Sequence, residues 1–504
     1  MNHIKQLYEH SLSLLTDLYQ LTMAYGYWKT NTINKEAVFT LFFRKQPFYG
    51  GYTIAAGLET VLEYLEDLHF TKTDLDYLAT LMGSDDKPLF EQAFLDYLGK
   101  LRFECDIDAM PEGTVVFPHE PLLRVQGPLL QCQLLETALL NIVNFQTLIT
   151  TKAARVCQAT QGEPVLEFGL RRAQGIDGAL TASRAAYIGG CAGTSNVLAG
   201  KLYGIPVKGT HAHSWIMSFD SEDEAFRAYA EAMPNNCIFL VDTFNTIEGI
   251  KKAIKMGQWL QENDYQLIGI RLDSGNFVSL SQKARQLLDE AGFKQTRIVA
   301  SNDLDELTIA NLKAAGAKID LWGVGTKLIT SYDQPALGGV YKLTAIRDSA
   351  EGEWQHRLKI SEEPAKTSNP GLLQVRRFSD SQQNEFICDM IYNQLQPPIK
   401  EPHLVSLNAF SHHPDLVEGH TTLPKNAPYQ DLLIPVVRKG EPVIKLPSLT
   451  QIRQHLQEQL AHCHESIKRL DMPETYPVHL EMNLYYLKQK LIDEARHNEP
   501  RDIL

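Results

Sequence analysis

The pattern of apolar and polar residues changes near residue 160, so the segments before and after this point are expected to differ in secondary structure. From there to residue 338, short apolar runs alternate with longer segments of helical periodicity. The runs recur at intervals of roughly 20 to 40 residues, which is typical of strand, helix, strand repeats and predicts a parallel sheet or a (β/α) barrel. The predicted strands are 165–168, 205–207, 238–241, 267–270, 297–300 and 319–322.

The flanking segments follow other patterns. Residues 11–30 and 129–158 carry apolar side chains at helical spacing, while 37–44 and two short runs within 113–128 resemble strands. Later strands are predicted at 340–343, 355–360 and 386–390, and Ser448 with Gln451 forms a capping box ahead of an amphipathic helix. We therefore divide the chain into residues 1–158, 159–338 and 339–504, and expect the last segment to contribute packing helices and strands that rejoin the N-terminal layer.

Composition narrows the functional class. The 504 residues carry a net charge of -13, which argues against a general binder of nucleic acid or anionic membrane. We find no uncharged apolar run of about 18 residues and no secretory signal at the N-terminus. The seven cysteines are dispersed and form no Cys-x-x-Cys pair, which is typical of reduced thiols. We expect a cytoplasmic enzyme.

Polar and glycine-rich residues follow each predicted strand of the central segment. In a (β/α) barrel the carboxyl ends of the strands meet on one face, where active sites are built. Six such strand exits therefore predict one reaction centre. They are 169–172, 209–214, 242–245, 271–276, 301–305 and 323–326.

The residue types in these exits indicate a site that binds phosphate and carboxylate groups. Arginines such as Arg171 bind carboxylate or phosphate in pairs of hydrogen bonds, although a surface ion pair is an alternative. Arg271 with Asp273 fits a sugar or metal site, or Asp273 or Ser274 caps a helix. Backbone amides and the hydroxyl of 323–327 fit a phosphate, or form a plain turn.

Two further exits are less specific. Gly209-Thr210-His211-Ala212-His213 presents two histidines two positions apart, which is an unusual way to build a core but also fits an exposed polar loop. Asp242-Thr243-Phe244-Asn245 superficially resembles the ribose-phosphate motif of type I phosphoribosyltransferases. It lacks the paired acids and the following Gly-Thr of that motif, so we do not assign that fold.

Six motifs, taken in order, resemble the nicotinate phosphoribosyltransferase family from about residue 11 to the C-terminal helix. One departure is Asn276, where the family usually carries an acid. The motifs are Thr16-Asp17-Leu18-Tyr19-Gln20-Leu21-Thr22-Met23, Glu167-Phe168-Gly169-Leu170-Arg171-Arg172, Gly209-Thr210-His211-Ala212-His213-Ser214, Arg271-Leu272-Asp273-Ser274-Gly275, Ser301-Asn302-Asp303-Leu304-Asp305-Glu306 and Gly323-Val324-Gly325-Thr326.

The resemblance implies an α/β fold, with an irregular (β/α) barrel at 159–338, an N-terminal α+β domain and a C-terminal helical segment. It also implies a head-to-tail homodimer with its sites at the subunit interface. The implied reaction forms nicotinate mononucleotide and pyrophosphate from nicotinate and phosphoribosyl pyrophosphate, coupled to ATP hydrolysis, in NAD salvage. Mg²⁺ is expected with the pyrophosphate and ATP, and no dedicated protein ligands for the metal are evident.

The resemblance also implies roles for individual residues. His213 is the histidine that ATP phosphorylates, and Asp273 lies beside the reacting ribose. Phe168 and Tyr19 of the neighbouring subunit sandwich the pyridine ring. The remaining substrate contacts fall on Arg171, Thr210, Ser214 and Arg271, with Gly323, Gly325 and Thr326 at the 5′-phosphate.

Three rival interpretations remain at this point. A nicotinamide-using relative would favour an acceptor carboxylate in the pocket, whereas His211 follows the Gly-Thr exit here. A Schiff-base aldolase on a barrel would use Lys327 as its nucleophile. A non-catalytic sensor of phosphoribosyl compounds would bind the same ligands without turnover.

Overall fold

The computed structural model describes residues 11–361, 366–380, 382, 384–398, 404–407, 423 and 427–498. Its contacts divide the chain into two compact units. The first unit contains residues up to 147, 336–448 and 455–504, and the second contains 148–335 with 449–454. Helices α7 (Glu136–Ala159) and α16 (Leu449–His462) run from one unit into the other.

The second unit is a parallel six-stranded sheet in the order β7-β6-β11-β10-β9-β8. Strand β11 returns to pair with β6, so the first strand of the unit neighbours the last, as in a barrel. The elements are β6 (Val165–Glu167), η3 (Leu170–Arg172), α8 (Ile176–Ile188), β7 (Gly193–Thr194), α9 (Val197–Tyr203), α10 (His213–Met217), α11 (Glu222–Ala232), η4 (Pro234–Asn236), β8 (Ile238–Leu240), α12 (Thr246–Glu262), β9 (Gly269–Leu272), α13 (Phe277–Glu290), β10 (Arg297–Asn302), α14 (Glu306–Ala314), β11 (Leu321–Val324) and α15 (Thr326–Ile329).

The sheet has a seam between β7 and β8, where the ladder of strand hydrogen bonds does not close within 148–335. The predicted strand at 205–207 is reduced here to one parallel bridge between Val207 and Thr194. A side chain spans the seam, because the backbone N–H of Leu240 in β8 donates to His211 Nε2 at 3.3 Å. The sheet thus has the strand order of a barrel, and side-chain contacts from the 209–213 segment, such as this one, bridge its open side.

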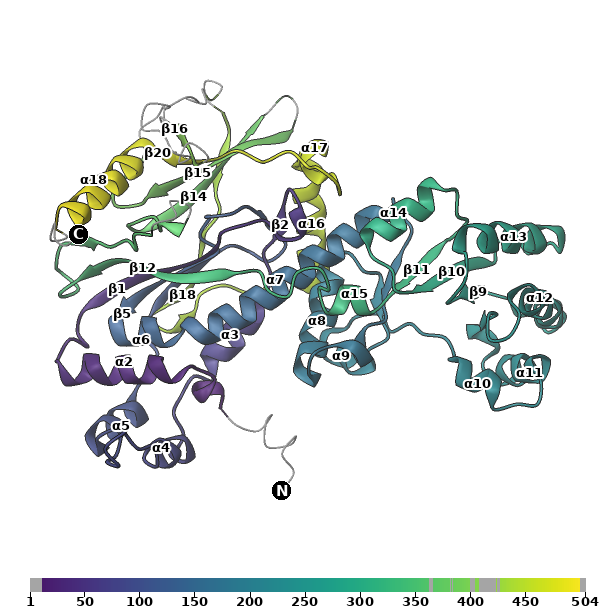
Figure 1. Ribbon diagram of the computed structural model, residues 1–504, viewed down its shortest axis with the longest axis horizontal. Coiled ribbons are helices and arrows are strands. Elements are labelled where there is room, and N and C mark those ends of the chain that lie inside the picture. The colour runs from purple at the N-terminus through teal and green to yellow at the C-terminus, as the bar shows by residue number, and fades with distance from the viewer. Residues whose placement is uncertain are drawn as a thin grey trace, which may run out of the picture. The chain divides into compact units, whose positions relative to one another are not determined.

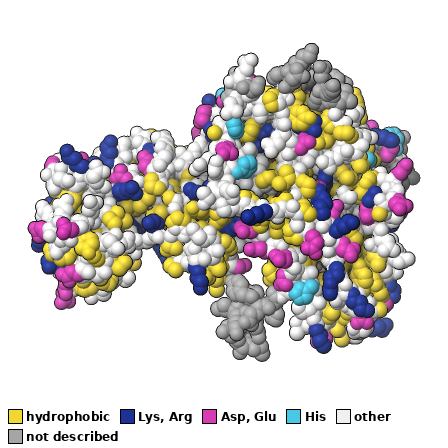
Figure 2. All heavy atoms as spheres, turned by 180° about the vertical axis from the view of Figure 1, so that it is seen from behind, with side chains coloured by type: hydrophobic (Ala, Val, Ile, Leu, Met, Phe, Trp, Pro, Cys, Tyr) yellow, Lys and Arg dark blue, Asp and Glu magenta, His cyan; other side chains and the backbone are white. Residues whose placement is uncertain are grey.

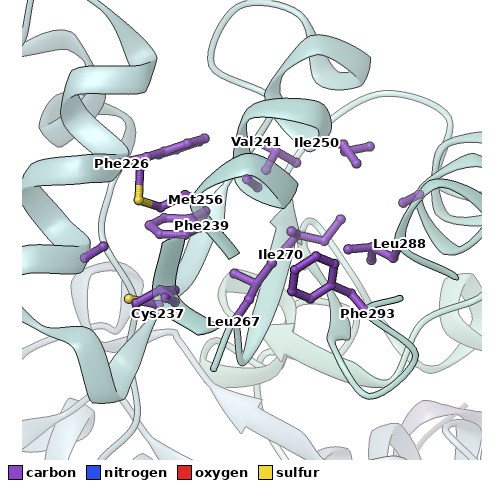
Figure 3. Close-up of a cluster of buried hydrophobic side chains, with 14 of the residues drawn as sticks. Phe226, Cys237, Phe239, Val241, Ile250, Met256, Leu267, Ile270, Leu288 and Phe293 are labelled. Carbon is purple, nitrogen blue, oxygen red and sulfur yellow. The ribbon is translucent and has the colours of Figure 1, made fainter. Parts of the chain in front are cut away.

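A buried apolar cluster holds β8 and β9 against helices α11, α12 and α13. Figure 3 shows Phe226 and Met256 next to Phe239, and Ile270, which pairs with Phe239 in the sheet, close to Phe293 in the same cluster. Phe239, Val241 and Ile270 are fully buried. Gly249 in α12 is required here, because a Cβ would lie 2.1 Å from the carbonyl oxygen of Val241. The end of β8 is therefore firmly anchored.

In its described residues, the first unit contains three antiparallel or mixed sheets (Figure 1). Strands from both ends of the chain share its largest sheet, in the order β13-β12-β1-β5-β3-β18-β19, and a five-stranded sheet has the order β16-β20-β15-β14-β17. The strands are β1 (Glu36–Phe43), β2 (Thr53–Ile54), β3 (Asp106–Ala109), β4 (Val115–Val116), β5 (Leu123–Pro128), β12 (Gly339–Arg347), β13 (Gln355–His356), β14 (Leu373–Asp380), β15 (Glu385–Asn393), β16 (Leu404–Ser406), β17 (Tyr429–Asp431), β18 (Ile434–Arg438), β19 (Glu441–Pro442) and β20 (Val478–Glu481).

Helices cover these sheets. Helix α2 packs through Leu21 and Ala24 on Phe94 and Leu130 in a common buried cluster. The helices are η1 (Leu12–Leu14), α2 (Leu18–Lys29), η2 (Pro47–Tyr49), α3 (Leu58–Glu66), α4 (Lys72–Leu78), α5 (Gln92–Lys100), α6 (Leu129–Leu134), α17 (Glu465–Lys468) and α18 (Met482–Asn498). None of the helices in the described part of the chain is long and apolar enough to cross a membrane.

Two predicted boundaries differ from the structure for local reasons. The helix expected over 11–30 begins only at Leu18, because Asp17 is extended and its carboxylate accepts from the Thr137 hydroxyl at 2.8 Å. The strand expected at 267–270 lies at Gly269–Leu272 instead. Arg271 is inside this strand, so the apolar run that predicted it ends before the strand does.

Candidate active site

A cavity of about 470 Å³ opens at the carboxyl ends of the strands in the second unit. Residues from five of the six predicted strand exits line it, and the exit of β8 does not contribute a lining residue. The lining side chains and backbone belong to Phe168, Arg171, Arg172, Ser195, Gly209, Thr210, His211, Ala212, His213, Arg271, Asp273, Ser301, Asn302, Asp303, Gly323, Gly325 and Thr326.

Arg271 organises the floor of this cavity. Its guanidinium donates to Thr210 Oγ1 at 2.8 Å, to Ser301 Oγ at 2.8 Å and to Asp273 Oδ1 at 3.0 Å. The Ser301 hydroxyl in turn donates to the same oxygen of Asp273. Arg271 in β9 and Asp273 directly after it therefore form an ion pair. Each of the two side chains is also hydrogen-bonded to a hydroxyl group of another strand exit.

Asp273 is held as a carboxylate. Burial acts to raise its pKa, but the hydrogen bonds from Ser301 and Arg271 and the charge of Arg271 outweigh burial and lower it. Its backbone N–H donates to Asp242 Oδ2 at 2.8 Å, and the Ser274 hydroxyl donates to the same oxygen at 2.7 Å. Neither Asp273 nor Ser274 caps the next helix, since Asn276 accepts the capping bond from the Ser279 N–H. This helix cap explains the asparagine at 276.

The two histidines of the 209–214 exit have different surroundings. His213 is the first residue of α10, with Nε2 3.8 Å from Asp273 Oδ2 and Nδ1 3.0 Å from Thr243 Oγ1. His211 is buried beside Tyr229, Phe226 and Phe239. Burial lowers the pKa of His211 to about 4, so its ring is neutral near pH 7. Only His213 combines a partly exposed ring with a nearby carboxylate.

The exit of β6 presents Phe168 to the cavity. The buried carboxylate of Glu167 accepts from the hydroxyls of Ser183 at 2.9 Å and Thr194 at 2.6 Å, and also from the Gly169 N–H. This fixes the backbone at the Phe168 ring. The ring also requires glycine at position 323, because a Cβ there would lie 2.7 Å from it. The predicted phosphate loop therefore also makes room for an aromatic side chain.

The remaining exits add polar groups. Asn302 lines the cavity at the end of β10 with a φ of 131°, a backbone conformation that is strained for asparagine and is typical of functional sites. Lys327, next to Thr326, is paired with Asp305 at 2.6 Å. The hydrogen bond and the charge of Asp305 raise the pKa of Lys327, so its amine is protonated near pH 7.

The structure brings most predicted site residues together. Phe168, Arg171, Thr210, His213, Arg271, Asp273, Gly323, Gly325 and Thr326 all line the cavity. Ser214 is exposed on α10 and does not line it. Tyr19 belongs to the first unit, on the first turn of α2, with 47% of its surface exposed.

Several lining residues had not been assigned a role from the sequence. Ser301 stood within a recognised motif, and its place at the end of a strand was the only signal that could have identified it. Ser195 follows the two-residue strand β7, which is too short to produce a hydrophobic pattern. Neither position could be linked to Arg271 or Glu167 without the fold.

Three family models cover most of the chain. The nicotinate phosphoribosyltransferase (NAPRTase) N-terminal domain matches residues 14–144, the NAPRTase family model matches 164–389, and the corresponding C-terminal domain matches 373–488. The nicotinate phosphoribosyltransferase of Bacillus subtilis (strain 168) is 45% identical over 494 residues, covering 97% of this chain and 96% of the relative. The chain belongs to the nicotinate phosphoribosyltransferase family.

A further relative and the structure of another family member agree with this assignment. The nicotinate phosphoribosyltransferase of Dictyostelium discoideum is 39% identical over 96% of this chain and 88% of its own length. The crystal structure of human nicotinic acid phosphoribosyltransferase matches with a TM-score of 0.81 at 32% identity, over 94% of this chain and 99% of that one. The nicotinate-nucleotide pyrophosphorylase of Pyrococcus furiosus shares the fold, with a TM-score of 0.66 at 23% identity. The mixed α/β fold predicted from the sequence is confirmed.

Proposed function

We propose that this protein is a nicotinate phosphoribosyltransferase that joins nicotinate to phosphoribosyl pyrophosphate, releasing pyrophosphate and forming nicotinate mononucleotide for NAD salvage. The observation that carries the proposal is the Arg271, Asp273 and Ser301 network in a cavity beside Phe168. Family membership supports it. The cavity combines an aromatic face, cations and a carboxylate, which are the groups that the two substrates require.

Nicotinate presents a flat ring and a carboxylate. Phe168 covers one face of the ring, and Arg171 or Arg271 binds the carboxylate through paired N–H donors. A nicotinamide substrate would place an uncharged amide against these cations, which lowers its affinity. The lining carboxylates are Asp273 and Asp303, and Asp273 is already bound to Arg271 and Ser301.

Phosphoribosyl transfer builds positive charge on the ribose as pyrophosphate leaves the anomeric carbon. The Asp273 carboxylate stabilises this charge, and the lowered pKa keeps it ionised at neutral pH. The nitrogen of the pyridine ring supplies the electron pair for the new bond, and the departing oxygen keeps the pair from the broken one. Gly323, Gly325 and Thr326 bind the 5′-phosphate through backbone N–H groups and a hydroxyl.

ATP hydrolysis is coupled to this reaction through His213, in the manner of a ligase. A lone pair of the imidazole attacks the γ-phosphorus, the bond to the bridging oxygen breaks, and ADP leaves with that electron pair. Water later hydrolyses the phosphohistidine. The position of His213 at the cavity, within 3.8 Å of Asp273, supports this role because the phosphoryl group would then form beside the transfer centre.

Mg²⁺ would be held mainly by the phosphate groups of the substrates. The described residues contain no group of three or more histidine, cysteine or acidic side chains that could hold a metal by themselves. Mg²⁺ usually keeps several waters and binds one or two carboxylates plus substrate phosphates. Asp273 and Asp303, which both line the cavity, fit that requirement. The ion would neutralise charge on the pyrophosphate.

A homodimer with the site at the interface completes the pocket, since Tyr19 of a second copy covers the open face of the pyridine ring. Exposed apolar side chains on and near the strand exits support an interface, because a monomer would leave them in water. Val197 on α9, Met217 on α10 and Phe244 are each more than two thirds exposed. Apolar side chains are also exposed among charged ones on the face shown in Figure 2.

The deciding experiment measures pyrophosphate release with nicotinate, nicotinamide or quinolinate, each with and without ATP. We expect turnover with nicotinate, stimulation by ATP, and little reaction with the other two. Absence of turnover with nicotinate would refute the transferase activity. A rate that is indifferent to ATP would refute the coupling alone, and a preference for nicotinamide would assign the protein to the related amide-using reaction.

Phosphorylation of His213 is tested with γ-labelled ATP. Acid-labile label should be absent from His213→Ala and present in His211→Gln, in which the glutamine oxygen can still accept from the Leu240 N–H. Label that persists in His213→Ala would place the phosphoryl group elsewhere.

A further inference from the structure

The exit of β8 carries a pair of residues, Asp242 and Thr243, to which the proposed reaction gives no task. Neither is among the residues that line the cavity. Each contacts a different residue of the reaction centre. Asp242 accepts from the backbone N–H of Asp273, and Thr243 Oγ1 lies 3.0 Å from His213 Nδ1.

The His213 ring is thereby bordered on two sides. Thr243 occupies the Nδ1 side, and the Asp273 carboxylate faces the Nε2 side at 3.8 Å. A hydroxyl can donate to or accept from either tautomer of imidazole, so its contact restrains ring rotation whichever nitrogen carries the proton. Among residues 148–335, Thr243 is the one hydrogen-bonding partner of the ring, and the Asp273 carboxylate lies beyond hydrogen-bond distance.

Thr243 is itself held in place from both ends. Val241, labelled in Figure 3, is fully buried, and its N–H donates to the Arg271 carbonyl at 3.1 Å. On the other side, Asn245 caps α12 by accepting from the Glu248 N–H at 3.1 Å. A short segment anchored in this way can orient a neighbouring ring, whereas a mobile loop could not.

We propose that Thr243 is a positioning residue for His213: its hydroxyl holds the imidazole at the angle from which the ring takes the phosphoryl group of ATP. This inference rests on the proposed function. Thr243 acts through His213 and does not touch ATP. Its loss therefore slows phosphorylation of the histidine and leaves the ATP-independent transfer of the phosphoribosyl group unchanged.

The test compares the wild type with Thr243→Val, which keeps the shape but removes the hydroxyl, and Thr243→Ser, which keeps the hydroxyl. Thr181→Val is the matched control, because its hydroxyl bonds only to carbonyls of its own helix α8. Rapid-quench incorporation of label from γ-labelled ATP gives the phosphorylation rate. Pyrophosphate release without ATP gives the basal transfer rate. The full-length protein is used throughout.

We expect phosphorylation about fivefold slower in Thr243→Val, as for the loss of one neutral hydrogen bond, with near wild-type rates in Thr243→Ser and Thr181→Val. An unchanged or faster rate in Thr243→Val would overturn the proposal, as would a parallel loss of basal transfer. A wild type that takes up no label would instead refute the ATP coupling. A wild type that labels normally while Thr243→Val labels equally well would refute the role of Thr243 alone.

Discussion

Two arginine and aspartate pairs, one in each unit, use the same chemistry in different surroundings. Arg377 and Asp389 of the first unit are 2% and 0% exposed, and Arg271 and Asp273 of the second line the cavity. In both pairs the guanidinium bonds to the carboxylate, and a hydroxyl donates to it as well, from Tyr476 in one case and Ser301 in the other.

The two pairs differ in how many of their hydrogen-bonding atoms already have partners within the protein. Arg377 also donates to Gln459 Oε1 at 3.0 Å and to the Val115 carbonyl at 2.8 Å. Burial and the charge of Asp389 raise the pKa of Glu120, which lies beside this pair, well above its usual range. Asp273, in contrast, directs its second oxygen toward His213. A saturated buried pair stabilises the fold, while an unsaturated pair at a cavity remains available for a substrate.

The strongest test of this comparison is Arg377→Gln. Removing the cation leaves the Asp389 carboxylate buried without its partner, which should lower the free energy of unfolding by about 3 to 5 kcal/mol. Urea denaturation measures the loss. The folded fraction should retain its transfer activity per site. A loss below about 1 kcal/mol would mean that the buried pair is dispensable.

A second test concerns His211, the buried ring that lies two positions before His213. Its pKa is about 4 in the folded protein and near 6.5 when unfolded, so the unfolded chain binds more protons between these values. Stability from this ring is therefore complete above pH 6.5 and is lost as the pH falls to 4, by about 3 kcal/mol. The unfolding free energy of His211→Gln should lack this part of the pH dependence between pH 7 and 4. Equal slopes in both proteins would contradict it.

The sequence predicted the cavity better than the fold around it. Polar residues after apolar strands are visible without a structure, and those of five exits meet as expected. Strand β14 was not predicted, because a pattern analysis assumes that charged residues face solvent, and Arg377 faces inward in an ion pair. The bridging of the seam was also not predictable, since it depends on side chains such as His211, which contacts a strand that begins 27 residues later.

The cavity pair gives the opposite outcome under the same substitution. In Arg271→Gln the groups that lose the guanidinium line an open cavity that water can enter, so the unfolding free energy should fall by less than in Arg377→Gln. The transfer rate with nicotinate should fall roughly 10²-fold, because Asp273 and the substrate both lose their cationic partner. Steady-state kinetics and urea denaturation on the same preparation separate the two effects. Equal damage to stability would place Arg271 with the structural arginines.

Lys327 provides the smallest expected effect and tests whether the cavity works without a nucleophilic amine. A Schiff-base lysine needs a lowered pKa, whereas the ion pair with Asp305 raises the pKa of Lys327. Lys327→Ala should therefore keep its transfer rate within about tenfold of the wild type, the cost of freeing Asp305 near the phosphate loop. Borohydride should trap no adduct with substrate in the wild type. A trapped adduct that disappears in Lys327→Ala would instead make this amine the reactive group and favour the aldolase mechanism.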